Sequence, residues 1–308
     1  MRLDEIELIT KKIGKSLYEL LISGGEPFLR QDLYDIVRLF KINCDIKKVN
    51  IPTNGFMTDT IVSVITDLMK DFPALEVSLK ISLDSLYEKH DRSKGIPGLF
   101  ERIVKLSDEL KSIEAKYPAF KRGVGITLTK ENENSINDII EFVAEKMNIH
   151  NISINYPRDY SVVNKDIVGI DPELYIKSAR DLLASQYKNF KNDFLNNVAK
   201  AIERTRYDTI YKIARDKRPV FRCMAGRKII VIDEIGDVYP CEIFPLKLGN
   251  LRQEQYDLNA LLAKKAGYLR KKLNVDKCFC TWECVLHWDI LSSLQGWRSV
   301  FERYKRGL

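Results

Sequence analysis

Five of the six cysteines of this 308-residue chain lie in its last third, with spacings that suit metal ligands. Cys278, Cys280 and Cys284 fall within one short stretch, and Cys223 and Cys241 precede them. Soft thiolates favour zinc or an iron-sulfur cluster, each typically held by about four sulfurs. We therefore expect a metal site that uses four of these five cysteines. Buried free thiols or disulfides are the alternative, which fits such clustering poorly.

A β-hairpin is predicted between Cys223 and Cys241. The β-branched run at 229–232 is followed by a polar turn at 233–237 and then by Val238 and Tyr239. Because the two arms of a hairpin run side by side, this element would bring Cys223 and Cys241 together.

Length and composition limit the classes of protein to consider. The length predicts about two domains, and 45% hydrophobic residues are ample for a large core. Charged residues interrupt the first twenty positions, so we expect no signal peptide, no membrane span and a cytoplasmic location, where thiols stay reduced. The net charge of +7 is modest and the basic residues are spread among acidic ones, so nucleic-acid binding is not indicated.

Helix-like and strand-like stretches alternate from residue 2 to residue 156, which is typical of parallel βα units. The expected strands are Leu20–Ile22, Val49–Pro52, Val77–Leu83, Gly125–Leu128 and Ile152–Asn155, with helices near 32–40, 60–69, 98–115 and 137–146. The chain opens on a helical pattern, whereas a parallel barrel ordinarily opens on a strand. The predicted fold class is α/β, a partial TIM-like (β/α) barrel that lacks its first strand.

Three parts are expected along the chain. The partial barrel occupies residues 1–160, and a polar, helical bridge without a clear strand pattern occupies 161–220. A small cysteine-rich domain follows at 221–308.

Glycines and polar residues follow the first three expected strands. Gly24-Gly25-Glu26-Pro27 follows the first strand, Asn54 follows the second, and Ser82 and Asp84 lie at the end of the third. Parallel α/β folds bind ligands at the carboxyl ends of their strands. Taken one by one, these residues could be ordinary turn or strand-end residues. His90 is expected in a loop and has no companion histidine for a metal site.

In order and spacing these motifs resemble the radical SAM enzymes. The resemblance is carried by residues 24–27, 52–55 and 82–84, and by His90-Asp91 followed by Gly95, Gly98 and Phe100. The cysteine-rich end resembles the SPASM/Twitch auxiliary-cluster domain that many of these enzymes carry. Its five cysteines resemble the shorter Twitch form with one cluster more than the full SPASM form.

This resemblance implies a partial barrel that holds S-adenosyl-L-methionine (SAM) and a [4Fe-4S] cluster, and that generates a radical which removes a substrate hydrogen atom. The implied SAM-binding residues are Gly24, Gly25, Glu26, Pro27, Asn54, Ser82 and Asp84. The glycine loop and its glutamate would meet the SAM amino group, and Ser82 and Asp84, on one face of their strand, could bond ribose hydroxyls. The implied partners are a peptide or small-molecule substrate and a reductant such as ferredoxin or flavodoxin.

The CxxxCxxC loop that defines the family is absent from this sequence, in which Cys44 is the only cysteine before Cys223. A cluster that leaves one iron open for SAM needs three protein ligands. We therefore expect that this chain does not cleave SAM by itself, and we interpret it as a truncated form in preference to a cluster-free homologue. The alternative function is a non-catalytic iron-sulfur, zinc-binding or electron-transfer protein. Spacing alone does not separate zinc from an iron-sulfur cluster, and it leaves open which four cysteines bind.

Overall fold

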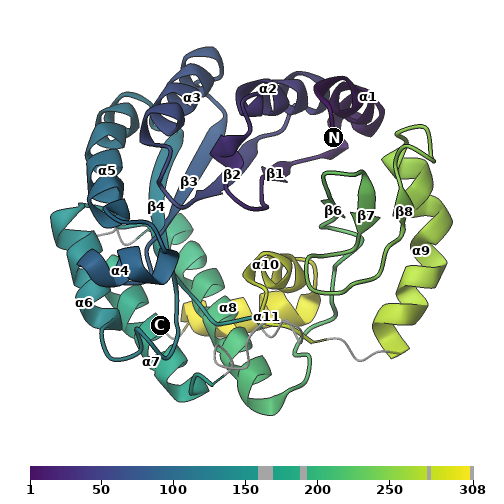
Figure 1. The fold of residues 1–308 in the computed structure, drawn as a ribbon. Helices are drawn as coiled ribbons and strands as arrows, with labels where there is room; N and C mark the ends of the chain where they lie inside the picture. Colours follow the sequence, from purple (N-terminus) through teal and green to yellow (C-terminus); the bar gives the residue numbers. More distant parts are fainter. Residues whose placement is uncertain (159–168, 188–192, 276–278, 306–308) are drawn as a thin grey trace. The chain divides into compact units, whose positions relative to one another are not determined.

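The computed structural model describes residues 1–158, 169–187, 193–275 and 279–305 (Figure 1). The chain forms two compact units. The first comprises residues 1–127 and 134–153, and the second comprises 128–133 and 154–308. In the described ranges, no helix is both long enough and apolar enough to cross a membrane.

The first unit is built on a five-stranded sheet with the strand order β1-β2-β3-β4-β5. The strands are β1 (Glu19–Leu21), β2 (Lys48–Thr53), β3 (Glu76–Ser82), β4 (Phe120–Thr127) and β5 (Ile152–Asn155). β1 to β4 pair in parallel, and their register aligns Leu20, Val49, Val77 and Phe120 in one row. The parallel α/β fold and all five predicted strands are thus confirmed.

Helices cover the outer side of this sheet (Figure 1). They are α1 (Leu3–Ile13), α2 (Leu33–Cys44), α3 (Thr58–Asp71), α4 (Tyr87–Lys94), α5 (Leu99–Lys116) and α6 (Ile136–Glu141), with short turns η1 (Gly14–Ser16), η2 (Pro27–Leu29) and η3 (Phe142–Lys146). In α3, Ile61, Ile65 and Leu68 are fully buried at helical spacing, as expected for a helix with one apolar stripe against a sheet. The loop predicted for His90 is wrong, because His90 lies inside α4 and is fully buried.

A buried arginine fixes β4 within the first unit. The Arg122 guanidinium donates to the Glu114 carboxylate at 2.8 Å and to the main-chain oxygens of Ser107, Met147 and Asn148 at 2.8, 3.2 and 3.0 Å. Its side chain is only 2% exposed. A charge removed from water to this degree needs such a complete set of partners, so Arg122 is a structural residue.

The second unit combines long helices with a small antiparallel sheet. Its elements are α7 (Pro172–Gln186), α8 (Phe194–Asp216), β6 (Val231–Ile232), β7 (Asp237–Tyr239), β8 (Gly249–Asn250), α9 (Leu258–Val275), α10 (Glu283–Leu291) and α11 (Leu294–Lys305). The predicted hairpin is confirmed, since β6 pairs antiparallel with β7. The described residues between 169 and 216 are largely helical, as predicted. The boundary between a bridge and a cysteine-rich domain stays a prediction.

Candidate functional site

The predicted SAM-binding residues lie at the carboxyl ends of three neighbouring strands. The loop 24–27 follows β1, Asn54 comes directly after β2, and Ser82 ends β3. Ser82 and Asp84 are half-buried while Leu83 between them is fully buried, so this strand alternation continues past the end of β3. The structure therefore brings these residues to one edge of the sheet.

Glu26 connects the loops that follow β1 and β2. Its carboxylate accepts hydrogen bonds from the Thr53 hydroxyl at 2.9 Å and the Asn54 main-chain N–H at 2.7 Å. It also accepts from the Phe28 N–H at 3.3 Å, at the start of η2. An ionised carboxylate has about four acceptor sites, so the protein itself uses most of this capacity. Glu26 is thus a positioning group as well as a negative charge at the site.

Asp84 plays a similar part between β3 and β4. One carboxylate oxygen accepts from the Thr127 main-chain N–H at 2.7 Å, and the other pairs with the Lys94 ammonium at 2.7 Å. The Asn54 side chain accepts from the Phe56 N–H at 2.9 Å and so closes a local turn. Asp84 and Asn54 therefore stabilise the backbone at the same edge of the sheet where a ligand would bind.

Gly24 and Gly25 are exposed and face open space. A Cβ atom built on either glycine would meet nothing within 4 Å, and Gly24 has a φ of +129°. Gly55 is different, since a Cβ there would lie 2.7 Å from the Ile103 side chain. Gly55 thus serves packing, whereas the backbone of Gly24 and Gly25 is accessible to a ligand that approaches closely.

The predicted metal ligands lie in the second unit. Cys241 is buried, and Cys223, Cys280 and Cys284 are half-buried, while Cys278 lies outside the described residues. Among the residues that the structure describes, no three cysteine, histidine or acidic side chains form a group that could hold a metal ion. The four-thiolate site therefore stays a prediction.

The local surroundings of two of these sulfurs suit a thiolate ligand. The Ala225 N–H points at the Cys223 sulfur at 3.4 Å, and the Phe244 N–H points at the Cys241 sulfur at 3.2 Å. Main-chain donors of this kind stabilise negative sulfur and tune iron-sulfur clusters. Burial, followed by the Glu283 charge, raises the pKa of Cys284 to about 12, and burial raises the pKa of Cys241. Cys241 and Cys284 would therefore become thiolate ligands only when a metal ion displaces the thiol proton.

The hairpin places the segments of Cys223 and Cys241 next to each other, as predicted. The Gly226 N–H donates to the Pro240 carbonyl at 3.1 Å. Gly226 has a φ of +74°, and a Cβ atom there would lie 2.0 Å from the Leu269 side chain. The positive φ and the close Leu269 side chain both favour glycine at this position.

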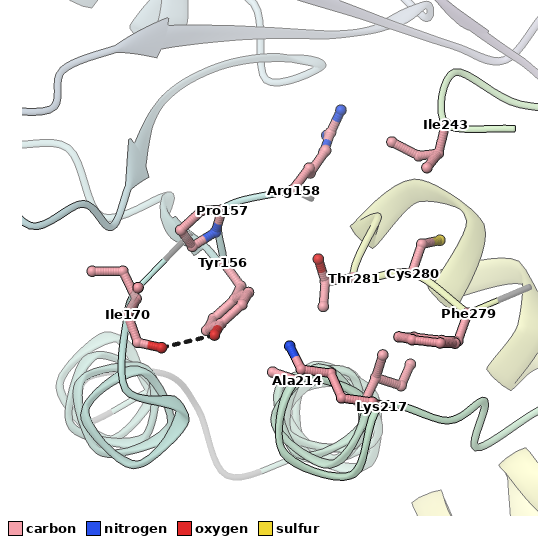
Figure 2. Close-up of a pocket in the computed structure, with 12 residues that line it drawn as sticks. Tyr156, Pro157, Arg158, Ile170, Ala214, Lys217, Ile243, Phe279, Cys280 and Thr281 are labelled. Atoms are coloured by element: carbon pink, nitrogen blue, oxygen red, sulfur yellow. Dashed lines mark hydrogen bonds between the residues drawn. The ribbon is translucent and has the colours of Figure 1, made fainter. Parts of the chain in front are cut away.

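A pocket in the second unit borders Cys280 (Figure 2). Its lining combines the cations Arg158 and Lys217 and the Thr281 hydroxyl with the apolar residues Ile170, Ile213, Ala214, Ile243 and Phe279. The Tyr156 hydroxyl on its wall donates to the Ile170 carbonyl at 2.8 Å (Figure 2). Because Arg158 already pairs with Glu242 and Glu283, the Lys217 ammonium and the Thr281 hydroxyl are the lining groups that suit an acidic or amide group.

Sequence reasoning missed several residues that organise these regions. Thr53 and Lys94 hold Glu26 and Asp84, and Arg158 contacts acidic residues that lie 84 and 125 positions further along the chain. The pairing of Lys94 with Asp84 spans ten positions and could have been considered from the sequence. The pairing of Arg158 with Glu242 and Glu283 could not be predicted from any local sequence pattern.

Comparison with known proteins finds one family match and several distant relatives. The sequence profile of the Radical SAM superfamily matches residues 1–143. AdoMet-dependent heme synthase of Methanosarcina barkeri (strain Fusaro / DSM 804) is 22% identical over 261 residues, which cover 82% of this chain and 69% of that protein. The antilisterial bacteriocin subtilosin biosynthesis protein AlbA of Bacillus subtilis (strain 168) is 28% identical over 239 residues, 77% of this chain and 47% of AlbA.

A solved structure of native anSMEcpe with bound AdoMet and Kp18Cys peptide has a similar fold. Its TM-score is 0.55 at 19% identity, covering 86% of this chain and 74% of that one. The superfamily match and the shared fold agree with the motifs at the ends of β1 to β3. Residues 1–143, slightly less than half of the chain, therefore match the radical SAM superfamily.

Proposed function

We propose that this chain binds SAM at the carboxyl ends of β1 to β3 and carries one auxiliary [4Fe-4S] cluster in its second unit. The observation that carries the proposal is the open loop of Gly24 and Gly25, held against the end of β2 by Glu26. This arrangement combines accessible backbone with a fixed negative charge, which suits the amino group of SAM.

The individual roles at the SAM site follow from the contacts. Gly24 and Gly25 would offer main-chain carbonyls to the SAM ammonium, and Glu26 would add its charge. The half-buried Ser82 would offer its hydroxyl to the ribose. Asp84, already bonded to Thr127 and Lys94, would mainly keep the ends of β3 and β4 in place.

The auxiliary cluster would be held by Cys223, Cys241 and two of Cys278, Cys280 and Cys284. The donors directed at the first two sulfurs support this ligand set. When bound, such a cluster supplies one-electron transfer, with a ferredoxin or flavodoxin as the reductant. A cytoplasmic setting would keep the thiols reduced before assembly.

The proposed substrate is a peptide, with a small polar metabolite as the wider class. The bacteriocin protein AlbA and the peptide-bound anSMEcpe structure support the peptide assignment. The pocket beside Cys280, which Lys217 and Thr281 line, is compatible with an acidic or amide group of such a substrate.

These 308 residues do not contain the three-cysteine motif that leaves one iron open for SAM. We expect the chain by itself, given dithionite and SAM, to form no 5′-deoxyadenosine above background. Production at enzymatic rates, measured by chromatography, would show that another part of the chain holds the SAM-cleaving cluster.

SAM binding is tested at the glycine loop by calorimetry. Gly25→Val puts a branched side chain into the open space, so SAM affinity should fall at least about tenfold while the melting temperature changes little. Gly267→Val is the matched control, because the Cβ position of Gly267 is also open and its φ is not positive. Wild-type affinity in the Gly25 variant would place SAM elsewhere.

The cluster is tested by anaerobic reconstitution and metal analysis. The chain should take up about four irons and four sulfides, and Cys223→Ser or Cys241→Ser should abolish this uptake. Cys44→Ser is the control, since Cys44 is buried in α2 and its thiol donates to the Thr10 carbonyl. Stoichiometric zinc without iron would favour the alternative, a zinc-stabilised binding protein.

A further inference from the structure

Helix α10 carries Cys284. Polar contacts connect this helix to the segments that contain Cys223 and Cys241. The first contact runs to the segment of Cys223. The Asp289 carboxylate accepts from the Met224 main-chain N–H at 2.6 Å. Met224 directly follows Cys223, so this bond fixes the backbone next to one predicted ligand.

The second contact is made by Arg158. One guanidinium nitrogen lies 2.9 Å from the Glu242 carboxylate, and another lies 3.2 Å from the Glu283 carboxylate. Glu242 directly follows Cys241, and Glu283 directly precedes Cys284. A single side chain thus connects the neighbours of two predicted ligands.

The bridge between Arg158 and the two glutamates is partly buried, unlike an ordinary surface ion pair. The side chains of Arg158, Glu242 and Glu283 are 27%, 21% and 11% exposed. The guanidinium also lies over the ring of the buried Trp282, with its carbon 5.7 Å from the ring centre. A planar guanidinium presents donors in a fixed fork, so it sets the spacing of two carboxylates in a way that a flexible ammonium does not.

Loss of the bridge would have a direct consequence for the cysteines. Without the guanidinium, two partly buried carboxylates would face each other without their shared cation, and like charges repel. Relief of this repulsion would move the segments of Cys241 and Cys284 apart. A metal site needs its ligands at defined distances, and the groups that orient ligands typically affect metal affinity by about 10–100-fold.

We infer that Arg158 is a positioning residue for the cysteine metal site, which it serves by clamping Glu242 to Glu283. This inference rests on the proposed function, because it requires that Cys241 and Cys284 bind metal. Arg158 touches no metal in this role and acts only through the two glutamates.

The test measures Co²⁺ affinity of the metal-free, reduced chain by the absorption of cobalt-thiolate bonds. Arg158→Gln keeps much of the side-chain volume but removes the charge, and we expect it to weaken Co²⁺ binding by about 10–100-fold. Arg303→Gln is the matched control. Arg303 is 18% exposed and donates twice to the Asp208 carboxylate, but neither residue adjoins a cysteine. The control should bind Co²⁺ within about twofold of wild type.

Two further variants separate positioning from general stability. Arg158→Lys keeps the charge but lacks the planar, fixed donors of the guanidinium, so it should have intermediate affinity and a native tryptophan spectrum without metal. In a Glu242→Gln/Glu283→Gln background, Arg158→Gln should have a much smaller effect, because the clamp is already gone.

The outcomes distinguish this inference from the proposed function. Wild-type Co²⁺ affinity in Arg158→Gln would overturn the role of Arg158 and leave the cysteine site intact. If Arg158→Gln fails to fold, Arg158→Lys decides, and wild-type affinity and spectrum in that variant overturn the inference. If the wild-type chain shows no cobalt-thiolate absorption, the proposed site itself is refuted.

Discussion

Asp289 should make the second unit less stable as the pH rises. Its side chain is almost fully buried in α10, and burial raises the pKa of the carboxyl to about 7, although the Met224 N–H bond acts in the opposite direction. In an unfolded chain an aspartate titrates near about 3.9. A carboxyl with a raised pKa in the folded state stabilises the fold at low pH, and this contribution is lost as the pH rises through about 7.

The size of the effect follows from the shift. The pKa moves by about three units and each unit corresponds to about 1.36 kcal/mol, so ionisation of Asp289 should cost about 4 kcal/mol of unfolding free energy at pH 8. Asp289→Asn cannot ionise, while its amide oxygen can still accept the Met224 N–H. The variant minus wild-type difference in unfolding free energy should therefore increase by about 4 kcal/mol between pH 4 and pH 8.

Urea unfolding of the metal-free chain, followed by tryptophan fluorescence, measures this difference. All three tryptophans, Trp282, Trp288 and Trp297, belong to the second unit, so the signal reports on the unit that contains Asp289. Other titrating groups are common to both proteins and cancel in the difference. A difference that stays flat from pH 4 to pH 8 would show that Asp289 titrates normally. A difference that falls with pH would show that the folded state stabilises the ionised form.

Three further substitutions test the fold around the sites. Glu26→Ala should speed hydrogen exchange of the Asn54 amide by about 30-fold, because loss of a charge-assisted bond costs about 2 kcal/mol; unchanged exchange in mass spectrometry would refute the bridge. Gly226→Ala should lower the unfolding free energy, measured by urea unfolding, by about 2 kcal/mol or more, because its φ is +74° and its Cβ would overlap Leu269; a wild-type unfolding free energy would contradict this. Arg122→Met should lower the unfolding free energy, measured by circular dichroism melts, by about 3–5 kcal/mol, because it leaves the Glu114 carboxylate without its cation. A loss below about 1 kcal/mol would argue against a structural role.

Periodicity in the sequence was enough to identify the sheet. Strands such as β2 bury every second residue and helices such as α3 bury one stripe, and both patterns are local properties of the chain. Glycines, prolines and acidic residues mark the ends of these elements for equally local reasons. The hairpin before Cys241 was predictable on the same grounds.

The placement of His90 shows where local reasoning fails. Its neighbours are polar and give no apolar stripe, yet the residue is fully buried within α4. Burial of this kind depends on what packs above the helix and not on its own sequence.

The sequence by itself therefore determined the α/β class, the order of the strands along the chain and the list of candidate residues at their ends. Only the tertiary structure decided how those residues are engaged. It showed that Glu26 and Asp84 join neighbouring strand ends, and that Arg158 connects Glu242 with Glu283 across 84 and 125 positions of sequence. The physical reason is that hydrogen bonds and ion pairs depend on distances in space, and folding brings such distant positions together without any periodic pattern in the sequence.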